Sequence, residues 1–139
     1  MLTRVLFALA LICGLSAGAS AEEIKVLALG LADHAVTQAE LETGEAPPAP
    51  HFNTPAVAYV LAAELKKGDM VEITLFNDNR SLIGNSETLG EDRATYLLRA
   101  GKSGVPAGGW PEGSYHAALK ISRDGKTLIE QATDPIPFD

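Results

Sequence analysis

The side chains most able to do chemistry are three histidines, His34, His51 and His116. They lie far apart in the sequence, and no pair has the short spacing with which neighbouring ligands converge on a metal ion. A folded sheet can bring distant residues together, so a metal site is an open alternative. We expect instead that all three are exposed to solvent, with His116 on the outward face of its strand, and we predict no metal ligands.

Acidic side chains cluster in two segments, and carboxylates of this kind could bind calcium. These residues are Glu40, Glu42 and Glu45 in the first segment and Glu87, Glu91 and Asp92 in the second. Neither cluster has the ligand spacing of a calcium loop, so we favour solvated loop charge. Outside the leader-like residues 1–21, the chain has no G-x-S-x-G motif and no other recognisable pairing of nucleophile and base, so we predict no catalytic residues and no cofactor.

A glycine-rich segment contains the single tryptophan, Trp110. Five glycines and two prolines lie between Gly101 and Gly113. Trp110 is either an exposed anchor for a ligand or partner, or a cap over one end of the core. We favour the cap, because the domain is small and has no disulfide. Trp110, Pro111 and Tyr115 are therefore the candidate partner-binding or core-capping residues.

The composition limits the class of protein. The 139 residues include 11 Lys and Arg against 18 Asp and Glu, a net charge of −7. Sequence-independent binding of nucleic acid requires a basic surface, so this class of function is excluded. A hydrophobic content of 46% argues against general disorder, and the length fits one domain.

Residues 1–21 have the pattern of a secretory signal peptide, with Arg4 before a short apolar run and Ala19-Ser20-Ala21 at the end. We expect residues 22–139 to form the domain, with no transmembrane segment in the mature chain. The only cysteine, Cys13, lies in the leader; its lipidation is a less favoured alternative. Loss of Cys13 leaves no thiol for a disulfide or a nucleophile. The periplasm is the expected location, and secretion is the alternative.

Alternating apolar residues predict strands over several segments. The clearest are Met70–Phe76 and Ser114–Ile121, where every second residue is apolar. Asp124-Gly125 predicts a hairpin turn after the second of these strands. Further predicted strands lie at Ile24–Leu31, Ser81–Ile83, Ala94–Arg99 and Thr127–Ala132.

Three segments are harder to interpret. Ala56–Leu65 has enough alanine and leucine for a helix, but its β-branched residues and β neighbours favour a strand. Asp33–Glu42 is either one helical turn or a loop, and Asn85–Asp92 is predicted to be a polar loop. Together the segments predict an all-β fold, a single immunoglobulin-like antiparallel β-sandwich of about seven strands.

The second half of the chain resembles exported bacterial immunoglobulin-like β-sandwich domains. The residues that carry this resemblance are Val57-Ala58-Tyr59, Lys67-Gly68-Asp69 before Val71-Glu72-Ile73, Trp110-Pro111-Glu112-Gly113-Ser114-Tyr115, and Asp124-Gly125-Lys126. It covers roughly Phe52 to Phe138. The resemblance implies a sandwich whose penultimate strand begins at the end of the segment from Trp110 to Tyr115. It implies no single activity, because such domains serve as ligand binders, spacers and docking modules.

The expected function is therefore a non-enzymatic periplasmic binding or accessory module that presents loops and sheet edges to a protein or a small ligand. A small hydrolase or carbohydrate-active enzyme is the alternative, and a metal carrier using histidines and carboxylates is a third. An enzyme would have a cleft with a titratable group of shifted pKa, whereas a binding module would have a shallow site around loops.

Overall fold

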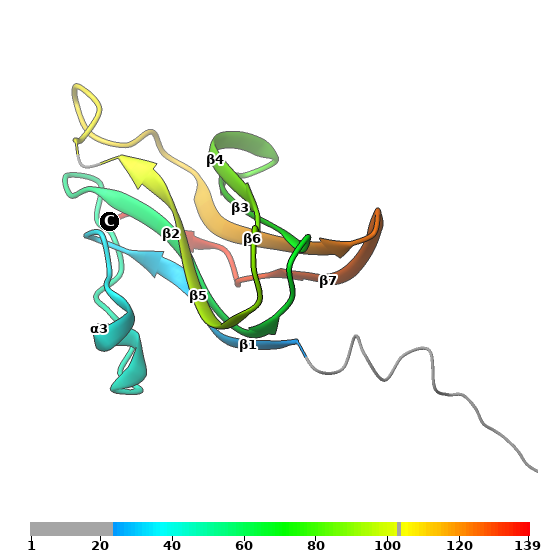
Figure 1. The fold of residues 1–139 in the computed structure, drawn as a ribbon. Helices are drawn as coiled ribbons and strands as arrows, with labels where there is room; N and C mark the ends of the chain where they lie inside the picture. Colours follow the sequence, from blue (N-terminus) through cyan, green and yellow to red (C-terminus); the bar gives the residue numbers. More distant parts are fainter. Residues whose placement is uncertain (1–23, 103) are drawn as a thin grey trace, which may run out of the picture.

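The computed structural model describes residues 24–102 and 104–139. The predicted leader, residues 1–21 with Cys13, lies outside this range. Two antiparallel β-sheets pack face to face over an apolar core, so the predicted all-β sandwich is confirmed (Figure 1). In the part of the chain that the structure describes, no helix is long and apolar enough to span a membrane.

One sheet has the strand order β1-β2-β5, and the other has the order β4-β3-β6-β7 with β8 paired to the start of β6. The strands are β1 (Lys25–Ala32), β2 (Ala56–Leu65), β3 (Met70–Asn77), β4 (Arg80–Thr88), β5 (Arg93–Lys102), β6 (Ser114–Arg123), β7 (Lys126–Ala132) and β8 (Ile136–Pro137). A five-residue helix, α3 (Gln38–Glu42), interrupts the long connection from β1 to β2.

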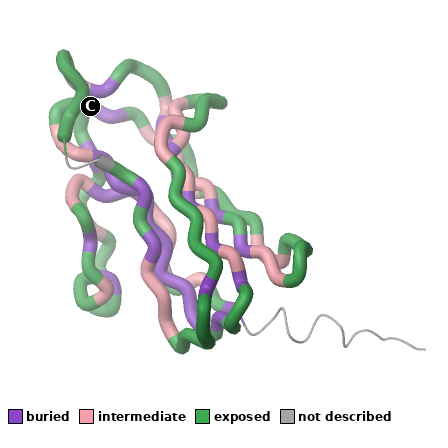
Figure 2. The backbone as a smooth tube through the Cα atoms, turned by 45° about the horizontal axis from the view of Figure 1, so that its top comes forward, coloured by how far each residue is buried: buried purple, intermediate pink, exposed green. Residues whose placement is uncertain are grey.

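Strict alternation builds the two central strands of the larger sheet. In β6, the side chains of Ala117, Leu119 and Ile121 are buried, and the residues between them are not (Figure 2). β3 buries Val71, Ile73 and Leu75 in the same way. The predicted hairpin after β6 is present, with Asp124 and Gly125 both at positive φ, 54° and 80°.

β2 is a strand, as predicted, although its sequence also suits a helix. Almost every residue in it is buried, because both of its faces are covered. Ala58, Val60 and Ala62 belong to the core between the sheets. Tyr59 and Leu61 belong to a second apolar cluster outside the sheet. That cluster is closed by Val36 and Leu41 from the α3 connection, so the double coverage explains the near-continuous apolar run.

The prediction of a polar loop from Asn85 was wrong. Asn85 to Thr88 continue β4, which pairs with β3 as far as Thr88 opposite Met70. These residues lack strand propensity, but they lie at the edge of the sheet, where pairing with β3 stabilises them and exposed polar side chains are acceptable. β5 is likewise longer than predicted, since it runs to Lys102.

Three edge strands each contain a β-bulge, and the extra residue is a leucine each time. The register of β1 skips Leu27, that of β4 skips Leu82, and that of β7 skips Leu128. Gly30 of β1 pairs in register with Tyr59, and the irregularity of this strand lies at Leu27. Bulges increase local twist and interrupt the edge, which limits edge-to-edge aggregation.

A buried ion pair joins Asp69, which directly precedes β3, to Arg123, the last residue of β6. The Asp69 side chain has no solvent exposure, and Arg123 donates to its two carboxylate oxygens at 2.8 and 2.9 Å. The Lys66 N–H donates to the same carboxylate at 2.8 Å. The main-chain carbonyl of Asp69 accepts from Leu89 N–H, so Asp69 joins the turn between β2 and β3 through its carboxylate and the link from β4 to β5 through its main chain.

Replacing Asp69 with Asn should lower the free energy of unfolding by about 3 kcal/mol, because Arg123 would lose its buried charge partner. Urea denaturation of Asp69→Asn, with exposed Asp134→Asn as the control, measures this loss. Burial opposes ionisation of Asp69, but the hydrogen bonds from Arg123 and Lys66 outweigh it and lower its pKa. The ionised Asp69 therefore stabilises the fold fully above pH 3.8, the ordinary pKa of an aspartate, and this stabilisation is lost as the pH falls through the lowered pKa of Asp69. Equal stability of both variants would contradict this account.

Candidate functional site

Trp110 lies in the core at one end of the sandwich. Its residue is 8% exposed, and its ring packs edge-on against Tyr115 and Phe138, with centroid distances of 6.3 and 6.1 Å. Tyr115 and Phe138 stack on each other at 3.7 Å. The Trp110 indole N–H donates to the Thr54 carbonyl at 2.8 Å, so its one polar atom is satisfied. In the free protein Trp110 therefore caps the core.

The loop that carries Trp110 is held by backbone contacts with Phe52. The Trp110 N–H donates to the Phe52 carbonyl at 2.8 Å. Gly109 has a φ of +91°, and a Cβ atom there would lie 2.7 Å from the Phe52 ring and 2.9 Å from its carbonyl oxygen. Glycine is required for this close approach. In Figure 1 the loop, drawn in yellow, leaves β5 and returns to β6 beside the C-terminus.

Tyr115 fixes the other end of the loop. Its side chain is fully buried, and its hydroxyl donates to the Pro111 carbonyl, the backbone contact that the sequence suggested. Burial raises the pKa of the Tyr115 phenol. Ser114 and Asp78 exchange two hydrogen bonds, at 2.7 and 3.1 Å, which tie the start of β6 to the turn between β3 and β4.

These contacts leave an apolar hollow of about 230 Å³ between the loop and β4. It is lined by Leu82, Ile83, Pro106, Trp110 and Pro111. Of the three residues singled out in the sequence, Trp110 and Pro111 line the hollow, while Tyr115 supports it from within the core. Two apolar side chains near the Trp110 loop are exposed: Val105 belongs to the loop, and Phe52 belongs to the connection from α3 to β2.

The contribution of β4 to the hollow was missed by sequence reasoning. Because Leu82 is the bulge residue, it and Ile83 both lie against the hollow instead of alternating. The available signal was the apolar pair Leu82-Ile83 in an otherwise polar segment. Pro106 lies in the glycine-rich segment from Gly101 to Gly113, but the sequence alone did not indicate that it lines the hollow.

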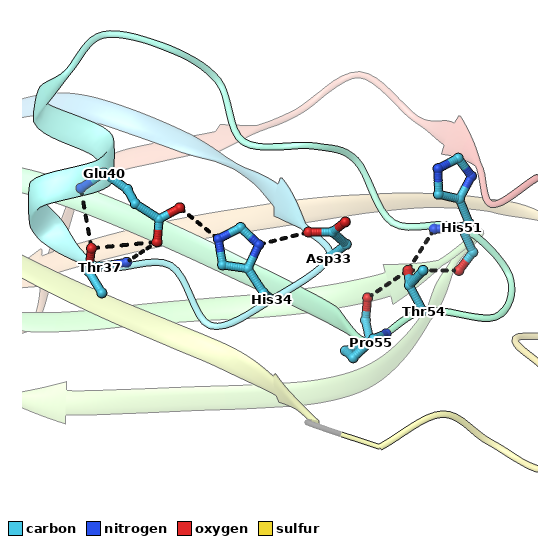
Figure 3. A network of polar contacts seen from close by, with 7 residues as sticks. All are labelled: Asp33, His34, Thr37, Glu40, His51, Thr54 and Pro55. Carbon is cyan, nitrogen blue, oxygen red and sulfur yellow. Dashed lines mark hydrogen bonds and ion pairs between the residues drawn. The ribbon is translucent and has the colours of Figure 1, made fainter.

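The three histidines lie apart, and their surroundings differ. His34 lies between two carboxylates: Nδ1 is 2.7 Å from Asp33 and Nε2 is 2.7 Å from Glu40 (Figure 3). His51 contacts the main-chain oxygen of Asp139, and His116, on the outer face of β6, stacks on Phe76 at 5.0 Å. Within residues 24–102 and 104–139, no three His, Cys, Asp or Glu side chains form a group able to hold a metal.

The His34 contacts secure α3 against the smaller sheet. Glu40 also closes a capping box with Thr37, the residue that begins the helix. Hydrogen bonds with Asp33 and then Glu40 raise the pKa of His34, since only the imidazolium can donate to both carboxylates. His34 and then the Thr37 N–H lower the pKa of Glu40. The Arg99 guanidinium adds a bond to the Val36 carbonyl at 2.7 Å, which further fixes this connection.

A second hollow, of about 400 Å³, lies on the outer face of the larger sheet. Thr74, Ala118 and Ala132 contribute to its lining, with charged side chains from Glu72, Lys120 and Glu130. Its lining comes from β3, β6 and β7 alone and contains no residue of the loop that carries Trp110. The hollow beside Trp110 is therefore the better candidate site.

Comparison with models of known protein families and with curated protein sequences finds no match to this chain. The chain is an all-β domain of two antiparallel sheets. Its function must accordingly be inferred from the site itself.

Replacing Trp110 with Ala should lower the free energy of unfolding by about 3–5 kcal/mol, the cost of emptying a buried aromatic site. Because Trp110 is the only tryptophan, its emission should be blue-shifted and resistant to quenchers in the wild-type protein. Urea denaturation and iodide quenching measure the two effects. A red-shifted emission together with unchanged stability in Trp110→Ala would show that Trp110 is not a cap.

Replacing Glu40 with Gln should lower the titration midpoint of His34 toward the ordinary value of 6.5. Glutamine retains the capping box but removes the negative charge, so the helix stays capped. In the wild-type protein the His34 contacts stabilise the fold fully below pH 6.5, and this contribution disappears as the pH rises through the raised pKa. An NMR titration of the His34 ring protons measures the midpoint. The same midpoint in both proteins would show that the Glu40 carboxylate does not raise the pKa of His34.

Proposed function

We propose that this protein is a non-enzymatic binding module that uses the loop end of the sandwich to hold a partner protein. The observation that carries the proposal is the apolar hollow between the Trp110 loop and β4. Its walls combine an indole, two prolines and two aliphatic side chains on a backbone held by hydrogen bonds. Rigid apolar surfaces of this kind need little ordering when a partner binds, which favours affinity.

Features of the fold support kinship with exported immunoglobulin-like domains. The strand orders β1-β2-β5 and β4-β3-β6-β7 make the chain cross between the two antiparallel layers after β2, after β4 and after β5. Tyr115 stands at the start of β6, and its hydroxyl bonds to the backbone four residues upstream. This is the geometry of the tyrosine corner found in such sandwiches. We therefore assign the chain to this broad class as part of the proposal, with the periplasm as its location on the basis of residues 1–21.

The contacts of the histidines favour binding over hydrolysis. Both ring nitrogens of His34 face carboxylates, and the His51 contact is with a main-chain oxygen. A hydrolase of the serine type needs a histidine nitrogen against a hydroxyl that it can activate. None of these contacts provides that arrangement, so we put forward no enzymatic function.

The test compares two leucines that occupy the same structural position on opposite edges. Leu82 and Leu128 are both half-buried bulge residues, one on β4 beside the hollow and one on β7 away from it. A partner isolated from periplasmic extract with the wild-type protein should bind Leu82→Ser about tenfold more weakly, as expected for loss of an apolar contact worth about 1.4 kcal/mol. Leu128→Ser should bind as the wild type does.

Calorimetric titration of the purified partner into the three folded proteins gives the affinities. Equal affinities of the wild type and Leu82→Ser would contradict the proposed site. A parallel loss in Leu128→Ser would show that the effect arises from altered stability, and it would equally remove the support for the hollow.

A further inference from the structure

β4 has a free backbone edge next to the hollow. Its described pairing is with β3 alone, so the other side of the strand presents unpaired main-chain groups. After the bulge at Leu82, the pairing of β4 runs without a shift from Ile83 to Thr88. An exposed edge of this length is able to accept a further strand.

The other edges are less suited to accept a strand. On β5, the Arg99 carbonyl already accepts a hydrogen bond from the Asn85 side chain at 2.8 Å. On β7 the bulge at Leu128 lies near the middle of the strand. On β1 the bulge lies at Leu27, and the first residue beyond the strand, Asp33, bonds through its N–H to the Pro48 carbonyl. β5 pairs with β2 without a shift and has a longer edge, but its Arg99 carbonyl is occupied. Among the three edges that contain a bulge, β4 has the longest regular stretch, from Ile83 to Thr88.

Alternate residues of β4 line the opening between the two sheets. Ile83, Asn85 and Glu87 pair with Leu75, Ile73 and Val71, whose side chains are all buried between the sheets. Paired residues share a face, so these three side chains of β4 point toward the side of β5. The Asn85 contact with Arg99 of β5 confirms this direction. Burial and then the negative charge of Glu87 raise the pKa of the Tyr96 phenol on β5.

The two ends of this row differ in chemistry. Ile83 adjoins the apolar hollow of about 230 Å³, which is below the roughly 300–1,000 Å³ of typical small-molecule pockets and suits one apolar side chain. Glu87 is an exposed carboxylate, in a protein with a net charge of −7. It suits a lysine or arginine side chain, and the overall charge would speed the approach of a basic partner.

We propose that the domain binds an extended segment of a basic partner protein, which adds as a new strand to the free edge of β4. The segment places an apolar side chain in the hollow beside Ile83 and a lysine or arginine side chain beside Glu87. Because side chains on one face of a strand recur every second residue, these two anchors lie four residues apart in the segment. The inference rests on the proposed binding function and specifies its ligand.

The probe is a set of peptides selected on the folded protein from a display library of random short sequences. The selected peptides should combine an apolar residue with a lysine or arginine four positions away. Each is then resynthesised with N-methyl groups on alternate residues, in both possible registers. One register removes the backbone donors that face β4 and should weaken binding about tenfold or more. The other register should leave the affinity nearly unchanged.

Charge reversal tests the second anchor. Glu87→Lys should lower the affinity for the selected basic peptides at least several-fold and should favour peptides with an acidic residue at that position. Glu130→Lys, an exposed carboxylate on β7, is the matched control and should change the affinity far less at moderate salt.

The outcomes separate this inference from the proposed function. Loss of binding in Leu82→Ser with equal tolerance of both N-methyl registers would leave the hollow as a binding site but overturn strand addition. Peptides that bind without any dependence on Leu82 or Glu87 would overturn both, as would a selection that yields no binding peptide.

Discussion

The buried position of the Trp110 side chain is the constraint on which the proposed binding surface depends. The indole fills the end of the core against Tyr115 and Phe138, and its N–H is satisfied by Thr54. The loop cannot then lift away without exposing a large aromatic surface. The Trp110 N–H donates to the Phe52 carbonyl and the Tyr115 hydroxyl donates to the Pro111 carbonyl, and these two bonds hold the loop on either side. The same packing that stabilises the core thus shapes a hollow in the surface.

The arrangement of the sheet edges explains why the hollow lies beside a strand with an unpaired main-chain edge. A sandwich leaves four edge strands, and unprotected edges promote aggregation. Here three edges carry leucine bulges, and a side-chain bond from Asn85 occupies a carbonyl on the fourth. On β4 the bulge lies near the beginning, so it directs Leu82 and Ile83 to the hollow and leaves the rest of the edge regular. Protection of the edge and the proposed recognition surface therefore lie on one strand.

The sequence predicted much of the fold, because the central strands obey simple rules. The alternation around Ile73 and Leu119, and the turn at Asp124-Gly125, followed from local chemistry. The extension of β4 through Asn85 to Thr88 could not be predicted in that way. Those residues form a strand because β3 lies beside them, and pairing between strands is a property of the tertiary structure.

The candidate site was predicted in part, for the same reason. Trp110 and Pro111 stood out by composition, whereas Leu82 and Ile83 join them only when β4 and the loop are brought together. The ion pair between Asp69 and Arg123 is also a long-range contact, and in the sequence Asp69 stood out only as part of the segment Lys67-Gly68-Asp69. The contact of His34 with Asp33 is between neighbours, but its contact with Glu40 requires the capped turn of α3.

The most direct measurement is backbone amide hydrogen exchange, followed residue by residue by NMR in the free protein and in its complex with a selected basic peptide. A strand added to β4 would protect alternate amides between Ile83 and Thr88, while contact with the hollow would slow exchange around Trp110. The account predicts protection in both places at once, with β7 unchanged. Protection confined to Lys126–Ala132, or to the outer face around Thr74, would contradict it.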